Sequence, residues 1–213
     1  ACMLAYPIRY NSVSCEWEQV GRSERVLFII TEQHKSQILK MIIAYLTDIN
    51  ESKFKFGHFT EEEKLRIEQA KQIMKKFRDN FHIIRIPNPT IDLVKTMIRE
   101  SCITNDIGYV FYDYIFSSPG LLSEFKSNNL REDVQLFLLS TALKDLATEL
   151  HIFMSSSTQL SGDFKNGRGV RDQSFIRSSK AVADKADVGC IMVRISDEEK
   201  ATISPLIESL GLP

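Results

Sequence analysis

The chain has 213 residues, and its 27 Lys and Arg side chains nearly balance its 28 Asp and Glu side chains, giving a formal charge of −1. Hydrophobic residues make up 43% of the sequence and charged residues 26%, which excludes a wholly disordered or fibrous chain. The balanced charge excludes a generally basic nucleic-acid coat, so any polyanion contact must come from a local cluster of Lys and Arg. Charged residues interrupt every apolar run, so the sequence predicts no membrane span and no membrane partner.

Short apolar runs predict five strands. The first is a continuous apolar stretch of the kind found in strands that are buried on both faces. The second is stopped by Pro87, and the third ends on Asp113. In chain order the predicted strands are 26–30, 81–86, 109–112, 151–154 and 188–195.

Helical segments alternate with these strands. Apolar residues at helical spacing predict a helix through Ile38 and Leu46. A second helix is expected to begin after Thr60 as N-cap, with Glu63 at the capping-box position. Further helices are predicted from Thr90 and over 132–150. Two stretches lack periodicity and are expected to be loops, namely 116–129 and 161–179.

Strands that alternate with helices in this way predict an α/β fold, with a mostly parallel sheet flanked by helices on both faces. Ligands of open α/β sheets bind at the carboxyl ends of the strands. The residues just past those ends are Glu32, Asp113 and Gln159. The sequence therefore predicts the functional site at that edge of the sheet.

The three residue types suit nucleotide hydrolysis. An Asp after an apolar strand has the form of a Walker B motif, in which the carboxylate orders Mg²⁺ and its waters. A second carboxylate, Glu32, is placed to polarise the attacking water as a general base. Gln159 is placed to sense the γ-phosphate and to pass that state to the following loop.

Each of these residues also has a structural interpretation. Asp113 can cap the next turn, Glu32 can interact with the positive end of a helix dipole, and Gln159 can be an ordinary loop residue. The three together, on three strand ends in this order, are a more specific signal than any one of them.

The phosphate-binding loop GxxxxGK[ST] is not found in these 213 residues. Gly162 and Gly167 have the right separation, but Arg168 and Gly169 follow them in place of Lys and Ser or Thr.

Four cysteines lie far apart without metal-ligand spacing, which favours unpaired core thiols in a reducing compartment over a zinc or disulfide site. They are Cys2, Cys15, Cys102 and Cys190.

The order of motifs resembles the carboxyl-terminal RecA-like ATPase domain of DnaB-type replicative helicases, especially the DnaB-like proteins of phages and mobile elements. The resemblance covers residues 1–200 and rests on a collinear set rather than on one motif. The matching segments are Val26-Leu-Phe-Ile-Ile-Thr-Glu32, Gln37-Ile-Leu-Lys-Met-Ile-Ile-Ala-Tyr45, Phe56-Gly-His-Phe-Thr-Glu-Glu-Glu63, Tyr109-Val-Phe-Tyr-Asp-Tyr-Ile115, Ala142-Leu-Lys-Asp-Leu-Ala-Thr-Glu-Leu150, Thr158-Gln159, Ile176-Arg-Ser-Ser-Lys180 and Asp184-Lys-Ala-Asp-Val-Gly-Cys-Ile-Met-Val-Arg194.

The resemblance implies a P-loop NTPase core that hydrolyses ATP with Mg²⁺ at the subunit interfaces of a hexameric ring, and so drives translocation along single-stranded DNA in the cytoplasm. Glu32, Asp113 and Gln159 would be its catalytic residues, Thr31 and Asp113 would bind the nucleotide, and Asp113 would hold Mg²⁺ through water. Primase and a loader are implied as further partners. Relative to the family, the phosphate loop, the arginine-finger segment and the primase-interacting domain are missing. Residues 1–213 are therefore expected to be a single truncated core from a longer helicase, with very slow ATP hydrolysis, if any, on their own.

Two loops are candidates for the DNA contact, because their Lys and Arg side chains can bind phosphates, and in the first of them neighbouring Gly residues allow close approach of the backbone. The loop after Gln159 carries Lys165, Arg168, Arg171 and Arg177, and the loop after Asp113 carries Lys126 and Arg131. A solvated surface loop is the alternative in both cases. For the whole chain the alternatives are a non-catalytic RecA-like DNA-binding or interaction module and, more weakly, a recombinase or circadian-type RecA relative.

Overall fold

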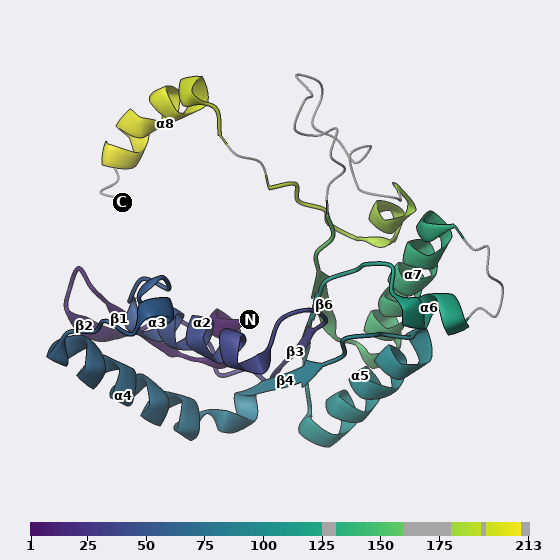
Figure 1. Cartoon of the computed structure of the whole chain (residues 1–213), viewed down its shortest axis with the longest axis horizontal. Coiled ribbons are helices and arrows are strands. Elements are labelled where there is room, and N and C mark those ends of the chain that lie inside the picture. The colour runs from purple at the N-terminus through teal and green to yellow at the C-terminus, as the bar shows by residue number, and fades with distance from the viewer. Residues whose placement is uncertain (125–130, 160–179, 193–194, 210–213) are drawn as a thin grey trace.

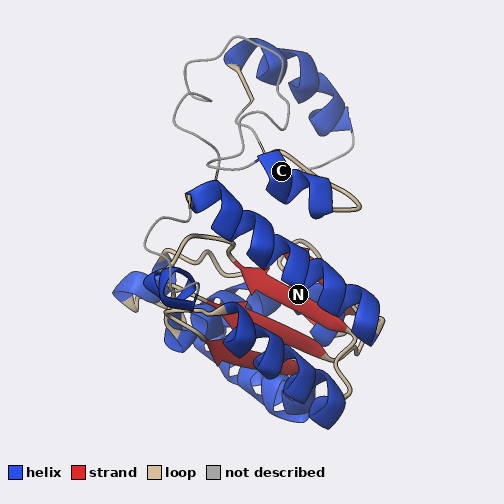
Figure 2. Ribbon diagram, turned by 90° about the vertical axis from the view of Figure 1, so that its right-hand side faces the viewer, coloured by secondary structure: helices blue, strands red, loops and turns tan. Residues whose placement is uncertain are grey.

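A computed structural model describes residues 1–124, 131–159, 180–192 and 195–209 of the chain. Its centre is a sheet of four parallel strands in the order β4-β3-β5-β6, as the sequence predicts (Figure 1). Figure 2 shows this sheet between two layers of helices. The strands are β3 (Val26–Ile30), β4 (Phe81–Arg85), β5 (Tyr109–Asp113) and β6 (Phe153–Ser156).

The register of the sheet determines where the functional edge lies. Ile30 of β3 pairs with Asp113 of β5, and Tyr112 pairs with Ser156 of β6. Because every pairing is parallel, all four carboxyl ends meet at one edge. The last residues of β3 and β5 are therefore direct neighbours.

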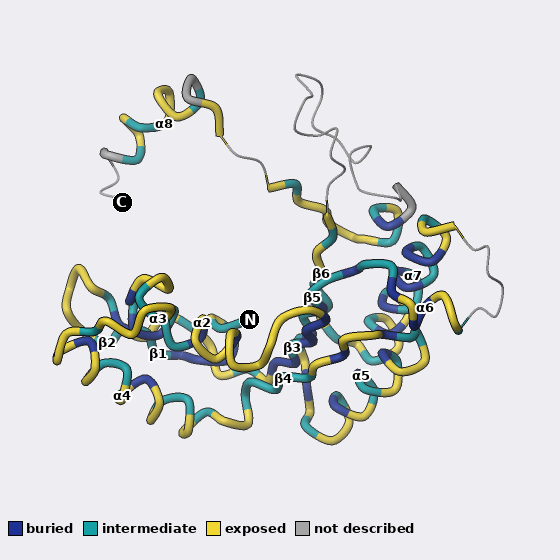
Figure 3. Tube along the Cα trace, in the orientation of Figure 1, coloured by how far each residue is buried: buried dark blue, intermediate teal, exposed yellow. Residues whose placement is uncertain are grey.

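Both faces of the sheet are buried, which explains the continuous apolar character of β3 (Figure 3). On one face, Leu27 and Tyr112 pack against α5 (Ile91–Asn105) and α7 (Glu132–Leu150). The other face is covered by α1, α2 and α4, and there Val26 packs with Ile42 and Ala70. These helices run over Cys2–Ala5, Lys35–Thr47 and Glu61–Lys76.

The helix starts follow the capping signals of the sequence. Thr60 accepts a hydrogen bond from the backbone N–H of Glu63, and the Glu63 carboxylate accepts one from the N–H of Thr60, which confirms the predicted capping box. Thr90 caps α5 in the same way through the N–H of Leu93. Lys53 of the short helix α3 (Lys53–Phe56) also forms an ion pair with Glu63.

A β-hairpin that the sequence did not predict precedes the sheet. Its strands, β1 (Ile8–Asn11) and β2 (Glu16–Gln19), pair antiparallel. The hairpin is attached to α2 by an ion pair from Arg9 to Asp48, the residue that ends this helix. Arg66 of α4 lies over the ring of Tyr10, 4.5 Å from its centroid.

The predicted loop over 116–129 is wrong in part, because it contains helix α6 (Pro119–Glu124). Ser118 supplies the N-cap, accepting a hydrogen bond from the N–H of Leu121 at 3.1 Å, and Pro119 takes the first helical position. Residues 125–130 of this prediction lie outside the described residues.

The carboxyl-terminal part departs further from the sequence predictions. The fourth strand begins at Phe153 rather than at residue 151, because His151 takes a left-handed conformation that ends α7. The predicted fifth strand at 188–195 is wrong for the residues that the structure describes, which pair with no neighbouring strand and leave Val188 and Met192 exposed. An apolar run becomes a strand only where a sheet edge is available to pair with it.

The remaining elements are short or lie at the end of the chain. They are the 3-10 helices η1 (Arg78–Asn80) and η4 (Lys180–Lys185) and the helix α8 (Asp197–Ser209), which lies apart from the sheet (Figures 1 and 2).

None of the four cysteines forms a disulfide, but Cys15 and Cys190 are exposed, so the prediction of core thiols is wrong for these two. Within the described residues, no helix has the length and apolarity needed to cross a lipid bilayer.

Candidate active site

The three predicted catalytic side chains come from neighbouring strand ends. Glu32 lies two residues beyond β3, Asp113 is the last residue of β5, and Gln159 lies three residues beyond β6. Because β5 pairs with both β3 and β6, the structure brings these residues to the same edge of the sheet.

A tyrosine that the sequence reasoning missed connects two of them. The phenol of Tyr114 donates a hydrogen bond to Oε1 of Glu32 at 2.9 Å. The same phenol oxygen accepts a hydrogen bond from Nε2 of Gln159 at 3.1 Å. Glu32, Tyr114 and Gln159 therefore form a hydrogen-bonded row across three strand ends, which we call the strand-end row. The only sequence signal for Tyr114 is its position directly after Asp113.

The backbone beneath this row is tied to β3 through Thr31. Both the N–H and the hydroxyl of Thr31 donate to the carbonyl oxygen of Asp113, each at 3.0 Å. The N–H of Tyr114 donates to the same hydroxyl at 3.4 Å. Thr31 is only 2% exposed, so these bonds satisfy a buried polar group. The predicted role of Thr31 in nucleotide binding remains a prediction, while its structural role is to hold the end of β5.

The Asp113 side chain is half-buried, and its Oδ1 accepts a hydrogen bond from the hydroxyl of Ser157 at 3.3 Å. Within the described residues, no group of three or more His, Cys, Asp or Glu side chains could enclose a metal ion. A single half-buried carboxylate such as that of Asp113 is compatible with Mg²⁺, which is commonly held by one or two carboxylates together with water and substrate phosphates. Asp113 is the residue that would hold it.

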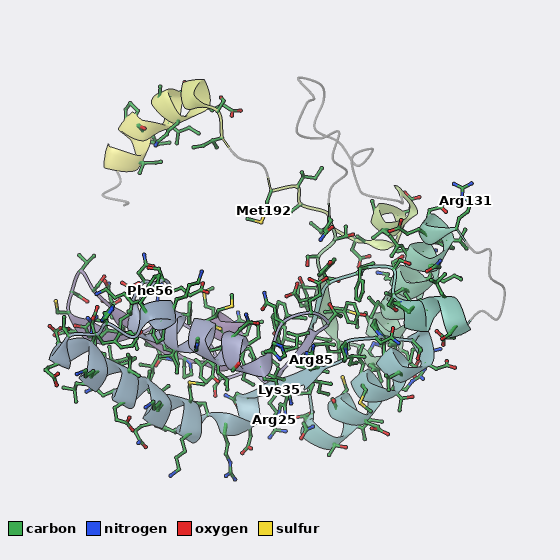
Figure 4. The ribbon with its side chains drawn as sticks, viewed as in Figure 1. Arg25, Lys35, Phe56, Arg85, Arg131 and Met192 are labelled. Atoms are coloured by element: carbon green, nitrogen blue, oxygen red, sulfur yellow. The ribbon has the colours of Figure 1, made fainter. Side chains whose placement is uncertain are left out.

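Two exposed cations lie at the same edge of the sheet. Arg85, labelled in Figure 4, ends β4, and its Nε donates to the carbonyl of Gln33, the residue after Glu32 in the chain, at 3.1 Å. Lys35 is the first residue of α2, whose first turn has no acidic side chain. The sequence reasoning did not single out either residue. Arg85 comes close to the segment after β3 only through the pairing of β3 with β4, whereas Lys35 lies three residues after Glu32 in the chain.

The predicted DNA-binding residues are described only in part. Arg131 immediately precedes α7, and its 81% exposed side chain forms an ion pair with Asp133 at 2.8 Å. Figure 4 shows it pointing away from the molecule. The other five predictions lie outside the described residues. These are Lys126, Lys165, Arg168, Arg171 and Arg177.

The fold and the strand-end residues define a class of protein, and a comparison with protein families identifies it. Residues 4–207 match the family model of the DnaB-like helicase C terminal domain. The chain therefore belongs to the DnaB-like helicase family, which confirms the resemblance seen in its motifs.

Relatives of known sequence come from a prophage and from plasmids. The chain is 33% identical over 214 residues to the SPbeta prophage-derived uncharacterized protein YorI of Bacillus subtilis, with 98% of this chain covered. It is 28% identical over 170 residues to a probable plasmid replicative DNA helicase of Chlamydia trachomatis serovar L2, with 79% of this chain covered. The matches span 42% and 36% of these relatives, so the chain corresponds to less than half of each.

Solved structures confirm the fold. An ATPase domain of known structure matches with a TM-score of 0.64 and 21% sequence identity, over 77% of this chain and 57% of that one. A DnaB-like replicative helicase, whose structure was described together with its interactions with primase, gives the same TM-score and identity over 77% of this chain and 39% of that one. The predicted RecA-like sheet, flanked by helices on both faces, is therefore correct.

Proposed function

We propose that this chain is the ATPase core of a DnaB-like replicative helicase, which couples ATP hydrolysis to translocation along single-stranded DNA. The observation that carries the proposal is the strand-end row, in which a carboxylate, a phenol and an amide lie beside Asp113 at the carboxyl edge of a parallel sheet. Family membership supports the same function.

Each side chain has a role in this proposal. Glu32 takes the proton from the attacking water, because it is an exposed carboxylate with one oxygen already fixed by Tyr114. Asp113 holds Mg²⁺ through water, and Gln159 senses the γ-phosphate. Bound Mg²⁺ supplies positive charge that offsets the charge of the phosphate oxygens. Thr31 keeps the end of β5 in register while these groups act.

Replacement of the base tests the proposal in the natural protein that contains these residues. Glu32→Gln preserves the size of the side chain and removes its ability to accept a proton. We expect ATP turnover to fall by about 10²-fold or more while binding of a fluorescent ATP analogue persists. Glu51→Gln, in the exposed segment between α2 and α3, is the matched control and should leave turnover unchanged. Full turnover in Glu32→Gln would exclude Glu32 as the base.

The alternative is a RecA-like module that binds DNA or protein without turning over ATP. The specific observation in its favour is that the 213 residues contain no GxxxxGK[ST] segment. The two functions differ in one measurement on the natural protein, because the alternative predicts no ATP turnover and no binding of the ATP analogue.

We assign the DNA contact to the basic residues after Gln159, with Lys126 and Arg131 as a second segment. The pattern of Lys and Arg beside Gly supports the first segment, and the positive charges of Lys126 and Arg131 support the second. Arg168→Ala combined with Arg171→Ala should weaken binding of an oligo-dT strand and flatten its dependence on salt. Unchanged affinity in a fluorescence anisotropy titration would remove these residues from the DNA site. A homo-hexamer, primase and a loader remain proposed partners, and light scattering of the natural protein tests the first of them.

A further inference from the structure

Tyr114 lies at the centre of the strand-end row, and the chemistry of its neighbours determines the direction of both hydrogen bonds. A phenol has one proton to donate, and an ionised carboxylate can only accept. The phenol O–H of Tyr114 therefore donates its hydrogen bond to Oε1 of Glu32, 2.9 Å away. The phenol oxygen is then left as an acceptor, so Gln159 must present its amide N–H₂ group, which lies 3.1 Å away.

The tyrosine is held from both sides. Its backbone N–H bonds to the Thr31 hydroxyl on the β3 side. On the β6 side, the N–H of the next residue, Ile115, donates to the carbonyl of Ser157 at 2.9 Å. The ring packs against the ring of Phe116, with the two ring centroids 5.4 Å apart. The phenol oxygen therefore has a defined position relative to both neighbouring strands.

This placement distinguishes the two oxygens of Glu32. Oε1 accepts the hydrogen bond of the phenol, whereas no hydrogen bond to Oε2 is found among the described residues, and the residue as a whole is exposed. A base whose first oxygen is fixed directs its second oxygen at a constant angle, which is how positioning groups raise a reaction rate.

We infer that Tyr114 is a positioning residue that transmits the state of Gln159 to the general base Glu32. The inference rests on the proposed function, because it assigns a role only if Glu32 acts as a base. In this arrangement Tyr114 acts through Glu32, so its hydroxyl affects the rate of hydrolysis rather than the binding of nucleotide.

The chain supplies a matched control two residues earlier. Tyr112 lies on β5, which ends one residue before Tyr114; it is 1% exposed, and its hydroxyl has no hydrogen-bond partner among the described residues. Tyr114→Phe and Tyr112→Phe each remove one hydroxyl group and leave the ring. Only the first substitution interrupts the strand-end row.

The test measures steady-state ATP hydrolysis by the natural protein, with and without oligo-dT. Tyr114→Phe should lower kcat by about tenfold or more, leave KM for ATP within about twofold, and remove most of the stimulation by DNA. Tyr112→Phe should behave as wild type. Wild-type kcat and stimulation in Tyr114→Phe would overturn the inference, and so would a raised KM with unchanged kcat.

Two further measurements separate positioning from folding and from the proposed function. The effects of Tyr114→Phe and Gln159→Ala on kcat, and on urea unfolding without nucleotide, should be less than additive, because both substitutions break one row. Strict additivity in both measurements would overturn the inference. A wild-type protein that neither binds nor hydrolyses ATP would refute the proposed function itself, whereas an active protein insensitive to Tyr114→Phe would refute only the role of Tyr114.

Discussion

The carboxylate of Glu124, at the end of α6, caps helix α5 by accepting hydrogen bonds from the backbone N–H groups of Ile91 and Asp92. The two distances are 2.6 Å from Oε2 and 3.0 Å from Oε1. A negative charge at a helix amino terminus is stabilised by the helix dipole and satisfies donors that have no partner within the helix. The segment that follows β5 is thereby attached to the helix that leads into that strand.

Removal of this cap should destabilise the protein. Glu124→Ala leaves two N–H groups of α5 without their carboxylate, and we expect a loss of about 1 kcal/mol in the free energy of unfolding. Urea denaturation followed by circular dichroism measures the change. Glu100→Ala, at an exposed position of α5, is the control and should leave stability nearly unchanged. Equal stability of Glu124→Ala and wild type would show that the cap contributes nothing.

A glycine permits the close approach of α6 to the loop after β4. A Cβ atom on Gly120 would lie 2.7 Å from the carbonyl oxygen of Pro89 and 2.9 Å from that of Asn88. Both contacts are with backbone, so one of the two segments must move. Gly120→Ala should therefore cost about 1–3 kcal/mol of stability in the same assay. Gly108→Ala, where a Cβ would meet nothing within 4 Å, is the matched control and should be tolerated.

The carboxylate of Asp48 makes the free energy of unfolding depend on pH in the acid range. A hydrogen bond from the Ser12 hydroxyl, helped by Arg9, holds the pKa of Asp48 below its ordinary value of 3.8. A lowered pKa in the folded state means that the carboxylate stabilises the protein fully above its pKa in the unfolded state. This stabilisation is lost as the pH falls through its pKa in the folded state. Stability should therefore decrease below about pH 4.

Asp48→Asn isolates this charge. Asp48 has a left-handed backbone conformation, with φ of 55°, and Asn tolerates that conformation well. The substitution should cost about 1 kcal/mol at pH 7 and much less at pH 3. Urea unfolding at the two pH values measures the difference. An equal cost at both would mean that the ionised carboxylate is not the stabilising group.

Because the hydroxyl of Tyr112 has no hydrogen-bond partner among the described residues, its removal should not lower the stability of the protein. Burial raises the pKa of this phenol, and its oxygen has no hydrogen-bond partner among the described residues. A buried polar group without a partner carries a desolvation cost. Tyr112→Phe should keep the ring packing and leave the protein as stable as wild type or up to about 1 kcal/mol more stable. A clear loss of thermal stability would show that the hydroxyl does have a partner.

The sequence was sufficient for the elements whose signals are local. The apolar run 26–30 is a strand because both of its faces are covered, and Thr60 with Glu63 begins α4 as its capping box predicts. The order of strand-end residues also identified the edge of the sheet where Glu32, Asp113 and Gln159 meet. Each of these inferences depends on residues that are close together in the chain or on a general property of parallel sheets.

The features that the sequence did not predict depend on contacts between residues that are distant in the chain. The hairpin strands β1 and β2 have four residues each and include charged side chains, so neither gives a clear apolar pattern. The run 188–195 looked like a strand, yet its pairing depends on a sheet edge that the run itself cannot reveal. Tyr114 became a candidate only through contacts with residues on two neighbouring strand ends.

The strand-end row also has a consequence for how the protein is made. It joins residues 82 and 45 positions apart, so it cannot exist until β3, β5 and β6 have all been synthesised and paired. Non-local pairing of parallel strands is the slow part of folding. A nascent chain that has emerged only as far as α5 already contains the hairpin and Glu32, but it lacks both the phenol and the amide. Glu32, the proposed general base, is therefore synthesised early and aligned last, so partly made chains lack the assembled strand-end row.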